Sequence, residues 1–273
     1  MMQNSKLNDK SIGGWTGFIP VDDTELFITD SGGTKQTIIY LNGSYADHGH
    51  WKKVVKELGS DYRHILYDER ARGKSRKSKD YSFDACLRDL SAIIRDRQIE
   101  KPILVGWSYG TILAVNWVRN NPDIASGILA IDSAVPYGLT GEDAKQRIYK
   151  LFNKLKWFIP IFSFFGLAAR MSAKQHAEIN IEINEISANL EPVLLDMQIP
   201  VRYVLATGAS RGGEEQEFTA MRESIEPVLI KNRNLKVSAK VPSNHESILS
   251  KDFKTIANSI NALAIEINPG LKF

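Results

Sequence analysis

Gly106, Ser108 and Gly110 form a Gly-x-Ser-x-Gly motif, whose spacing could present a serine hydroxyl for nucleophilic attack. A serine hydroxyl is a poor nucleophile by itself, so this chemistry also needs an adjacent base and a third group that orients the base. The two glycines are expected because a sharp bend brings a strand and a helix so close that a Cβ atom would clash. The motif also arises by chance, so its meaning depends on its flanks.

The residues on either side of the motif have the pattern of a strand and a helix. Residues 102–105 are a short apolar run that is typical of a buried parallel strand. Residues 111–119 have the composition of a helix, which the Asn-Asn-Pro sequence at 120–122 should end. This order predicts that Ser108 is pushed outward on a strained bend between a strand and a helix.

Strands and helices are predicted to alternate along the rest of the chain. Strands are expected at 17–21, 25–29, 37–41, 63–67, 126–131, 201–207 and 236–241, and helices at 50–58, 214–232 and 247–267 and after Ser82. The alternation favours an α/β fold with a mostly parallel sheet covered by helices on both faces. The first two strands should form a hairpin that adds an antiparallel edge.

The alternation stops at residues 134–199, the insertion, where helical patterns occur without a strand. The insertion should lie over the carboxyl edge of the sheet, where α/β folds bind their ligands. Its most apolar part, 157–169, contains 13 uncharged residues and is interrupted by Pro160, so it is too short to span a bilayer. An apolar cover over a site favours an apolar acyl or alkyl group in the substrate. Transient contact with a membrane through Phe162 and Phe165 is an alternative use of this run.

Composition and charge exclude several classes of protein. The 273 residues, 43% of them hydrophobic and 25% charged, suit one soluble α/β domain that carries an insertion. A net charge of +3 gives no argument for nucleic acid as a partner. Residues 1–14 lack the apolar core of a signal peptide, and the single cysteine excludes an internal disulfide, so a cytoplasmic location is expected. That cysteine, Cys86, falls at helical spacing among apolar residues and is predicted to be a buried hydrophobe.

Four motifs, in this order, resemble those of the α/β-hydrolase superfamily. They are Leu-Asn-Gly-Ser at 41–44 with Trp51 after it, Asp-Glu-Arg-Ala-Arg-Gly-Lys-Ser at 68–75, the serine turn at 106–110, and Ser-Asn-His-Glu at 243–246. In that family these are the oxyanion loop, an Asp-x-Arg-x-x-Gly-x-Ser turn, the nucleophile turn and the histidine loop. The resemblance covers nearly all of the chain. It implies an α/β-hydrolase core at 15–133 and 200–273, with the insertion as a helical cap.

The resemblance implies a catalytic triad that begins with Ser108. Of the five histidines, only His245 follows the last predicted strand, so it is the expected base. The family usually carries the acid shortly after the strand before the last, but no carboxylate stands at that spacing here; Glu214 and Glu215 come slightly later. Some branches place the acid after the preceding strand, where this chain has Asp132. We favour Asp132, with the two glutamates as alternatives.

Two backbone N–H groups should stabilise the negative charge that develops on a carbonyl oxygen under attack. The resemblance assigns them to Tyr109, directly after the serine, and to Ser44 in the loop after the third strand. The family often has His-Gly where this chain has Asn42 and Gly43, which should alter how this loop is braced. Asp68 and Arg70 are expected to brace the turn after the fourth strand rather than to take part in the chemistry.

The expected function is that of a serine hydrolase that cleaves a small, apolar carboxylic ester through an acyl-enzyme. The expected reaction uses no cofactor and no metal, and the partner is a small-molecule substrate rather than nucleic acid, with no stable membrane span and an open oligomeric state. The same triad could instead cleave amide, lactone or carbon–carbon bonds, or perform cofactor-free perhydrolysis. A non-catalytic ligand receptor on this fold is a third hypothesis. Dehalogenation is disfavoured, because that branch has aspartate where this chain has Ser108.

Overall fold

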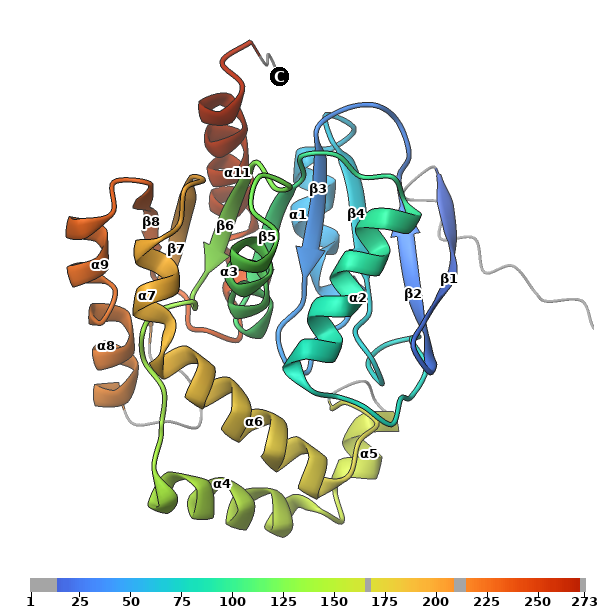
Figure 1. The fold of residues 1–273 in the computed structure, drawn as a ribbon, viewed down its shortest axis with the longest axis vertical. Coiled ribbons are helices and arrows are strands. Elements are labelled where there is room, and N and C mark those ends of the chain that lie inside the picture. Colours follow the sequence, from blue (N-terminus) through green and yellow to red (C-terminus); the bar gives the residue numbers. More distant parts are fainter. Residues whose placement is uncertain (1–13, 165–167, 209–214, 271–273) are drawn as a thin grey trace, which may run out of the picture.

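The computed structural model describes residues 14–164, 168–208 and 215–270, with backbone only for 215–218. Eight strands form a single sheet in the order β1-β2-β4-β3-β5-β6-β7-β8 (Figure 1). They are β1 (Trp15–Val21), β2 (Thr24–Asp30), β3 (Thr37–Leu41), β4 (Arg63–Tyr67), β5 (Ile103–Trp107), β6 (Gly127–Ile131), β7 (Val201–Ala206) and β8 (Leu235–Val241). The predicted mostly parallel sheet is therefore confirmed.

The sheet combines an antiparallel edge with a parallel centre. β1 pairs with β2 as a hairpin, and β2 pairs antiparallel with β4. The pairings from β4 through β3, β5, β6 and β7 to β8 are all parallel. Every residue of β3, β6 and β7 is buried, as expected of strands covered on both faces. β5 lies between β3 and β6, so the end of β5 is at the centre of the sheet.

Helices cover both faces of the sheet, and each face has its own hydrophobic cluster (Figure 1). On one face lie α2 (Phe83–Asp96), α3 (Tyr109–Asn120), α7 (Leu190–Leu195) and α9 (Glu226–Lys231). On the other lie α1 (Lys52–Leu58), α10 (Ile248–Lys251) and α11 (Phe253–Ile267). Cys86 of α2 is buried as predicted, and burial raises the pKa of its thiol to about 12. A thiol that stays protonated is no nucleophile.

The described part of the insertion contains helices and no strand. Its helices are α4 (Glu142–Leu155), α5 (Ile159–Phe164), α6 (Ala173–Ala188) and α7. Figure 1 shows α4, α5 and α6 beyond the carboxyl ends of the strands, while α7 packs beside α3 and α9. None of the helices in the described ranges is long and apolar enough to cross a membrane.

Some predicted helices are interrupted. A 3₁₀ turn, His48–Trp51, precedes α1. The helix predicted at 214–232 consists of α8 (Glu215–Glu223) and α9 in its described part, because Pro227 starts a new helix near its first position. The last helix divides into α10 and α11 at Asp252, whose carboxylate accepts a hydrogen bond from Ser243.

Candidate active site

Ser108 is held on a strained bend between β5 and α3. Its φ of 55° and ψ of −120° lie in a region that residues with a side chain rarely adopt. The Ser108 N–H donates to the carbonyl of Ile131, 3.1 Å away, and its own carbonyl accepts from the N–H of Thr111 at 3.0 Å. A strained backbone persists only where its surroundings fix it, and such positions cluster at functional sites.

The two glycines of the motif are needed for two different close approaches. A Cβ atom on Gly106 would lie 2.5 Å from the backbone nitrogen of Thr111 in α3. A Cβ atom on Gly110 would lie 2.2 Å from the carbonyl oxygen of Leu41 at the end of β3. The predicted clash between strand and helix is therefore confirmed at Gly106, whereas Gly110 lets α3 approach the neighbouring strand.

The structure brings Ser108, His245 and Asp132 together. Nε2 of His245 lies 2.9 Å from Oγ of Ser108, and its Nδ1 lies 2.9 Å from Oδ2 of Asp132. Because an ionised carboxylate can only accept, Nδ1 is the protonated nitrogen of a neutral ring and Nε2 is free to accept from the serine hydroxyl. This geometry is suited to removing the serine proton.

Asp132 follows β6 and is fixed by the backbone around it. Its φ is 48°, and its N–H donates to the carbonyl of Val204. Oδ1 accepts from the N–H of Ala206 at 2.9 Å, so Oδ2 remains for His245. Nε of Arg222 in α8 lies 3.5 Å from Oδ1. No sequence motif pointed to Arg222.

Glu214 lies outside the described residues, and so does the side chain of Glu215. Among the described side chains, the carboxylate that contacts His245 is that of Asp132, while the catalytic roles of the three residues stay predictions.

Trp107 positions the histidine loop, and sequence reasoning missed it. Its indole Nε1–H donates to the carbonyl of His245 at 3.2 Å, and the two ring centroids are 5.7 Å apart. The indole also lies beside the His50 ring, with the two centroids 6.1 Å apart. The only sequence signal was a large aromatic residue directly before the serine, in a position of the motif that specifies no residue type.

One buried arginine contacts both residues that were predicted to donate the oxyanion N–H groups. Nε of Arg72 donates to the carbonyl of Ser44 at 2.6 Å, and its guanidinium lies 5.7 Å from the ring centroid of Tyr109. Arg72 is only 4% exposed. The oxyanion loop is also pressed against β5, because a Cβ atom on Gly43 would lie 2.9 Å from the indole of Trp107. The Arg72 contact had no recognisable sequence signal, since it joins two motifs across the fold.

Asn42 braces the oxyanion loop through its backbone N–H and its side-chain amide. Its backbone N–H and its side-chain amide donate to the two carboxylate oxygens of Glu69, at 3.1 and 2.9 Å. The amide also donates to the carbonyl of Tyr67, and its oxygen accepts from the indole of Trp51. Complete burial raises the pKa of Glu69 to about 7.

Asp68 and Arg70 brace the turn after β4, as predicted. Asp68 accepts from the backbone and ring of His48 and from the N–H of Lys74, all at 2.8 Å. Arg70 makes a buried two-pronged ion pair with Asp89, at 2.7 Å for each bond. Both side chains therefore hold the turn that carries Arg72.

The remaining histidines have partners elsewhere. His48 bonds to Asp68, and His50 caps its own helical turn with Asp47. His64 accepts from the Tyr40 hydroxyl and donates to the carbonyl of Gly59, so both of its nitrogens are used. His176 lies in the insertion, where its Nε2 bonds to the carbonyl of Ala169.

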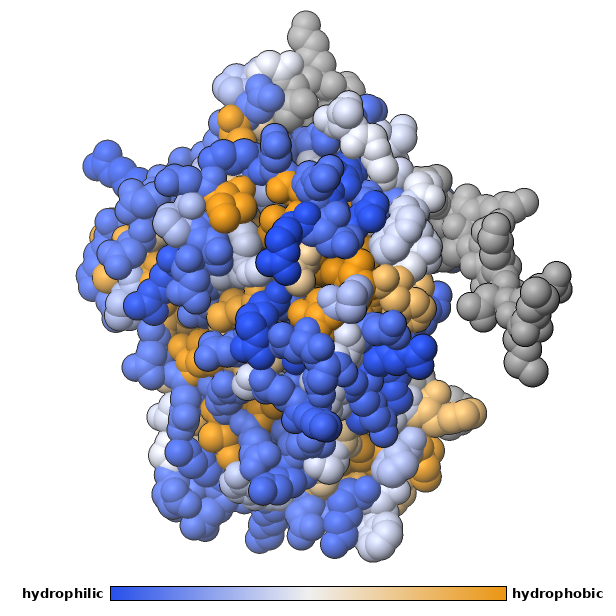
Figure 2. Space-filling view, turned by 45° about the vertical axis from the view of Figure 1, so that its right-hand side comes forward, coloured by the Kyte–Doolittle hydropathy of each residue, from blue (hydrophilic) through white to orange (hydrophobic). Residues whose placement is uncertain are grey.

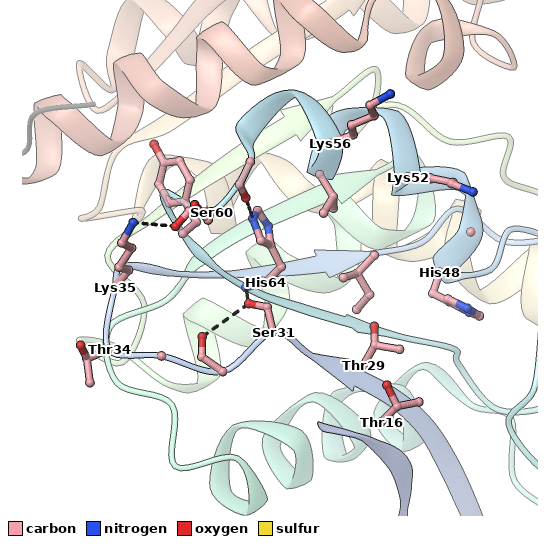
Figure 3. A pocket seen from close by; sticks show the side chains of 17 residues that line it. Thr16, Thr29, Ser31, Thr34, Lys35, His48, Lys52, Lys56, Ser60 and His64 are labelled. Atoms are coloured by element: carbon pink, nitrogen blue, oxygen red, sulfur yellow. Dashed lines mark hydrogen bonds between the residues drawn. The ribbon is translucent and has the colours of Figure 1, made fainter. Parts of the chain in front are cut away.

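A large groove lies between α1 and the face of β2 and β4 (Figure 3). Its volume is about 940 Å³, and it is lined by neither Ser108, Asp132 nor His245. Two of the residues that line the groove are joined by a hydrogen bond, in which Nζ of Lys35 donates to the carbonyl of Ser60 at 2.6 Å. The groove therefore belongs to a different surface from the candidate site.

The fold and this arrangement of side chains define the class of protein. The family model described as the alpha/beta hydrolase fold matches residues 36–192, more than half of the chain. The chain belongs to the alpha/beta hydrolase fold family. The resemblance inferred from the four motifs is confirmed.

Several curated proteins are similar to parts of this chain. Karrikin insensitive 2 receptor IA of Petunia hybrida is 29% identical over 119 residues, which are 41% of this chain and 42% of the relative. A haloalkane dehalogenase of Mesorhizobium japonicum is 26% identical over 47% of this chain and 42% of its own length. A putative esterase/lipase of Haemophilus influenzae is 28% identical over 44% of each chain. The chain thus matches less than half the length of these relatives.

Solved structures match the chain over nearly its whole length. The esterase from Exiguobacterium antarcticum has a TM-score of 0.70 and 18% identity, covering 90% of this chain and 98% of the esterase. Bromoperoxidase from Bacillus anthracis has a TM-score of 0.69 and 17% identity, covering 92% and 99%. At such identities the likeness shows the fold alone.

Proposed function

We propose that this protein is a serine hydrolase that cleaves a small, apolar carboxylic ester through an acyl-enzyme. The observation that carries the proposal is the unbroken hydrogen-bonded chain from Ser108 through His245 to Asp132. A base in contact with the hydroxyl, itself oriented by a buried carboxylate, is what activation of a serine requires.

In the proposed first step, Oγ of Ser108 attacks the ester carbonyl carbon while Nε2 of His245 takes the hydroxyl proton. The carbonyl oxygen becomes an oxyanion that accepts from the backbone N–H groups of Tyr109 and Ser44. The imidazolium, stabilised by Asp132, then gives its proton to the departing alkoxide, which leaves as an alcohol. The acyl group remains on Oγ as an ester.

In the proposed second step, water hydrolyses the acyl-enzyme, with His245 again acting as the base. His245 removes a proton from a water molecule, whose oxygen attacks the acyl carbon and forms a second tetrahedral intermediate. The proton returns to Oγ of Ser108 as the carboxylic acid leaves. Ser108 and His245 regain their starting states, and Asp132 stays ionised throughout.

We propose that the insertion covers this site as a cap. Nδ2 of Asn180 in α6 donates to the hydroxyl of Tyr45 at 3.1 Å, and the ring of His176 lies 5.7 Å from that of Tyr45. Tyr45 directly follows Ser44, so α6 is coupled to the oxyanion loop. The apolar composition of the insertion supports an apolar acyl or alkyl group in the substrate.

A second candidate is a ligand receptor on the same fold. It is favoured by the partial similarity to Karrikin insensitive 2 receptor IA, whose name describes a receptor. The relative named a haloalkane dehalogenase gives less support for dehalogenation, because Ser108 occupies the motif position where an aspartate would be required. The cytoplasmic location expected from the sequence stays a prediction.

Labelling with a fluorophosphonate probe, together with hydrolysis of p-nitrophenyl esters of increasing acyl length, tests the proposal. Wild type should label and turn over esters, and Ser108→Ala should lose both, because the probe and the substrate need the same oxygen. The ester panel then locates the preferred acyl length. Folded wild-type protein that neither labels nor hydrolyses any ester would contradict the enzyme and favour the receptor.

A further inference from the structure

Residues 157–164, which comprise the end of the link after α4 and the whole of α5, expose an unusual number of large apolar side chains. Trp157 is 77% exposed and Phe164 is 84% exposed. Between them, Phe158, Ile161 and Phe162 are 53%, 52% and 37% exposed. Single exposed apolar residues are ordinary, whereas a contiguous group marks an interaction surface.

This apolar group lies at an extreme edge of the molecule. α4 forms the side of the insertion that is remote from the sheet, and α5 lies near one end of α6 (Figure 1). The space-filling view shows hydrophobic side chains gathered at the lower right, where α5 lies (Figure 2). Phe158 and Phe162 stack on each other with ring centroids 6.2 Å apart. Within α5, Ile159 is buried and Ser163 donates to the carbonyl of Ala169, whereas Ile161, Phe162 and Phe164 are exposed.

The helix that precedes this group has a basic outer face. α4 packs against α6 through its buried residues Ala144 and Phe152. Arg147, Lys150 and Lys154 recur at intervals of three and four on the exposed face. Among the described residues, none of these three cations is in an ion pair.

Cation and aromatic ring also meet at the junction itself. Nζ of Lys156 lies 5.5 Å from the ring of Trp157. Amphipathic side chains of this kind are suited to a boundary where an apolar phase meets water, because the ring enters the apolar side and the ammonium stays at the polar side. The arrangement therefore provides both parts of an interfacial anchor in one continuous segment.

We propose that the surface formed by residues 147–164 docks onto an anionic lipid bilayer. The apolar side chains of 157–164 enter the region between headgroups and acyl chains, while the basic face of α4 contacts anionic headgroups. The inference goes beyond the proposed function and does not depend on it, since it rests on exposure and charge alone.

The charges distinguish this occupant from a second copy of the chain. A symmetric dimer through this surface would place the cations of one α4 close to those of the other, which is unfavourable. An anionic bilayer instead complements them. The experiment must therefore distinguish lipid binding from self-association.

Sedimentation with sucrose-loaded vesicles tests the inference on the full chain. Vesicles of phosphatidylcholine that contain about 30% of the anionic lipid phosphatidylglycerol are compared with vesicles of pure phosphatidylcholine. We expect at least roughly tenfold tighter partitioning to the anionic vesicles, and loss of most of this preference at about 0.5 M salt, because screening shortens the reach of the charges.

Two variants separate the two parts of the surface. Trp157→Ser with Phe164→Ser should weaken binding to anionic vesicles roughly tenfold or more, through loss of apolar burial. Lys150→Glu with Lys154→Glu should abolish the preference for anionic vesicles. Ile230→Ser is the matched control, since Ile230 is 82% exposed on α9, outside this surface, and should leave binding unchanged.

Three results would overturn the inference. They are equal partitioning to both vesicle types, equal loss in the Ile230 control, and a concentration-dependent dimer in analytical ultracentrifugation that the Trp157 and Phe164 changes dissolve. Circular dichroism and the melting temperature of each variant guard against misfolding, which is not expected for exposed positions.

Discussion

Nδ1 of His245 lies 2.9 Å from Oδ2 of Asp132, although the two residues are 113 positions apart in the chain. The pairing is possible because β6 and the loop after β8 finish at the same edge of the sheet. The other carboxylate oxygen is bonded to the N–H of Ala206, so the carboxylate cannot rotate away without breaking a buried hydrogen bond.

The first prediction concerns Asp132→Asn. The asparagine oxygen would keep the bond from the N–H of Ala206, and the amide N–H₂ would then face Nδ1 of His245 and favour the wrong tautomer. We expect kcat to fall on the order of 10⁴, with the unfolding midpoint little changed. Glu215→Gln is the comparison: an equal loss there, with an active Asp132→Asn enzyme, would move the acid role to Glu215.

The second prediction concerns Arg72→Met. The substitution removes the bond to the Ser44 carbonyl and the cation beside Tyr109, so both predicted oxyanion donors lose a shared support. We expect kcat to fall roughly 10- to 100-fold with KM nearly unchanged, because these donors act mainly on the transition state. Arg88→Met, at a half-exposed arginine of α2, should not affect kcat. An unchanged kcat per folded molecule of Arg72→Met would contradict the positioning role.

The third prediction concerns Gly110→Ala. Alanine is the better helix former, but its Cβ would lie 2.2 Å from the carbonyl oxygen of Leu41, and neither backbone can yield easily. We expect a loss of about 3 kcal/mol or more in the free energy of unfolding, measured with urea. Gly32→Ala has no atom within 4 Å of its Cβ and only the strain of a φ of +71°, so it should cost about 1–2 kcal/mol. A smaller loss at Gly110 than at Gly32 would show that β3 and α3 are not rigidly apposed.

The fourth prediction concerns the pH dependence of stability at Glu69. Burial raises the pKa of this carboxyl in the folded protein to about 7, from 4.5. The folded state therefore favours the protonated form, and the resulting stability is present below pH 4.5 and lost as pH rises through 7.

Comparison with Glu69→Gln isolates this effect, because glutamine does not titrate and the other ionisable groups are common to both proteins. We expect the free energy of unfolding of wild type, relative to the variant, to fall by about 2 kcal/mol between pH 5 and pH 8. Urea unfolding at the two pH values measures it. A difference that stays constant over this range would mean that Glu69 titrates normally.

The sequence predicted the sheet well because its strands are short apolar runs and its breaks are marked by glycine, proline and asparagine. It also predicted that Ser108 and His245 would meet, since the ends of parallel strands lie at a common edge, and the family resemblance favoured Asp132 over the two glutamates as their partner. It did not predict Trp107, Arg72 or Arg222. Each acts through a contact between segments that no local pattern connects, and such contacts depend on side-chain packing in three dimensions.

The order of the segments along the chain has a consequence for biosynthesis. The serine precedes its base by 137 residues, and the base follows the last strand of the sheet. A chain made from its N-terminus therefore carries the serine while the insertion and β7 are still being added. Until β8 pairs with β7, the Ser108 hydroxyl lacks His245 beside it, so the proposed ester hydrolysis should first become detectable when folding is complete.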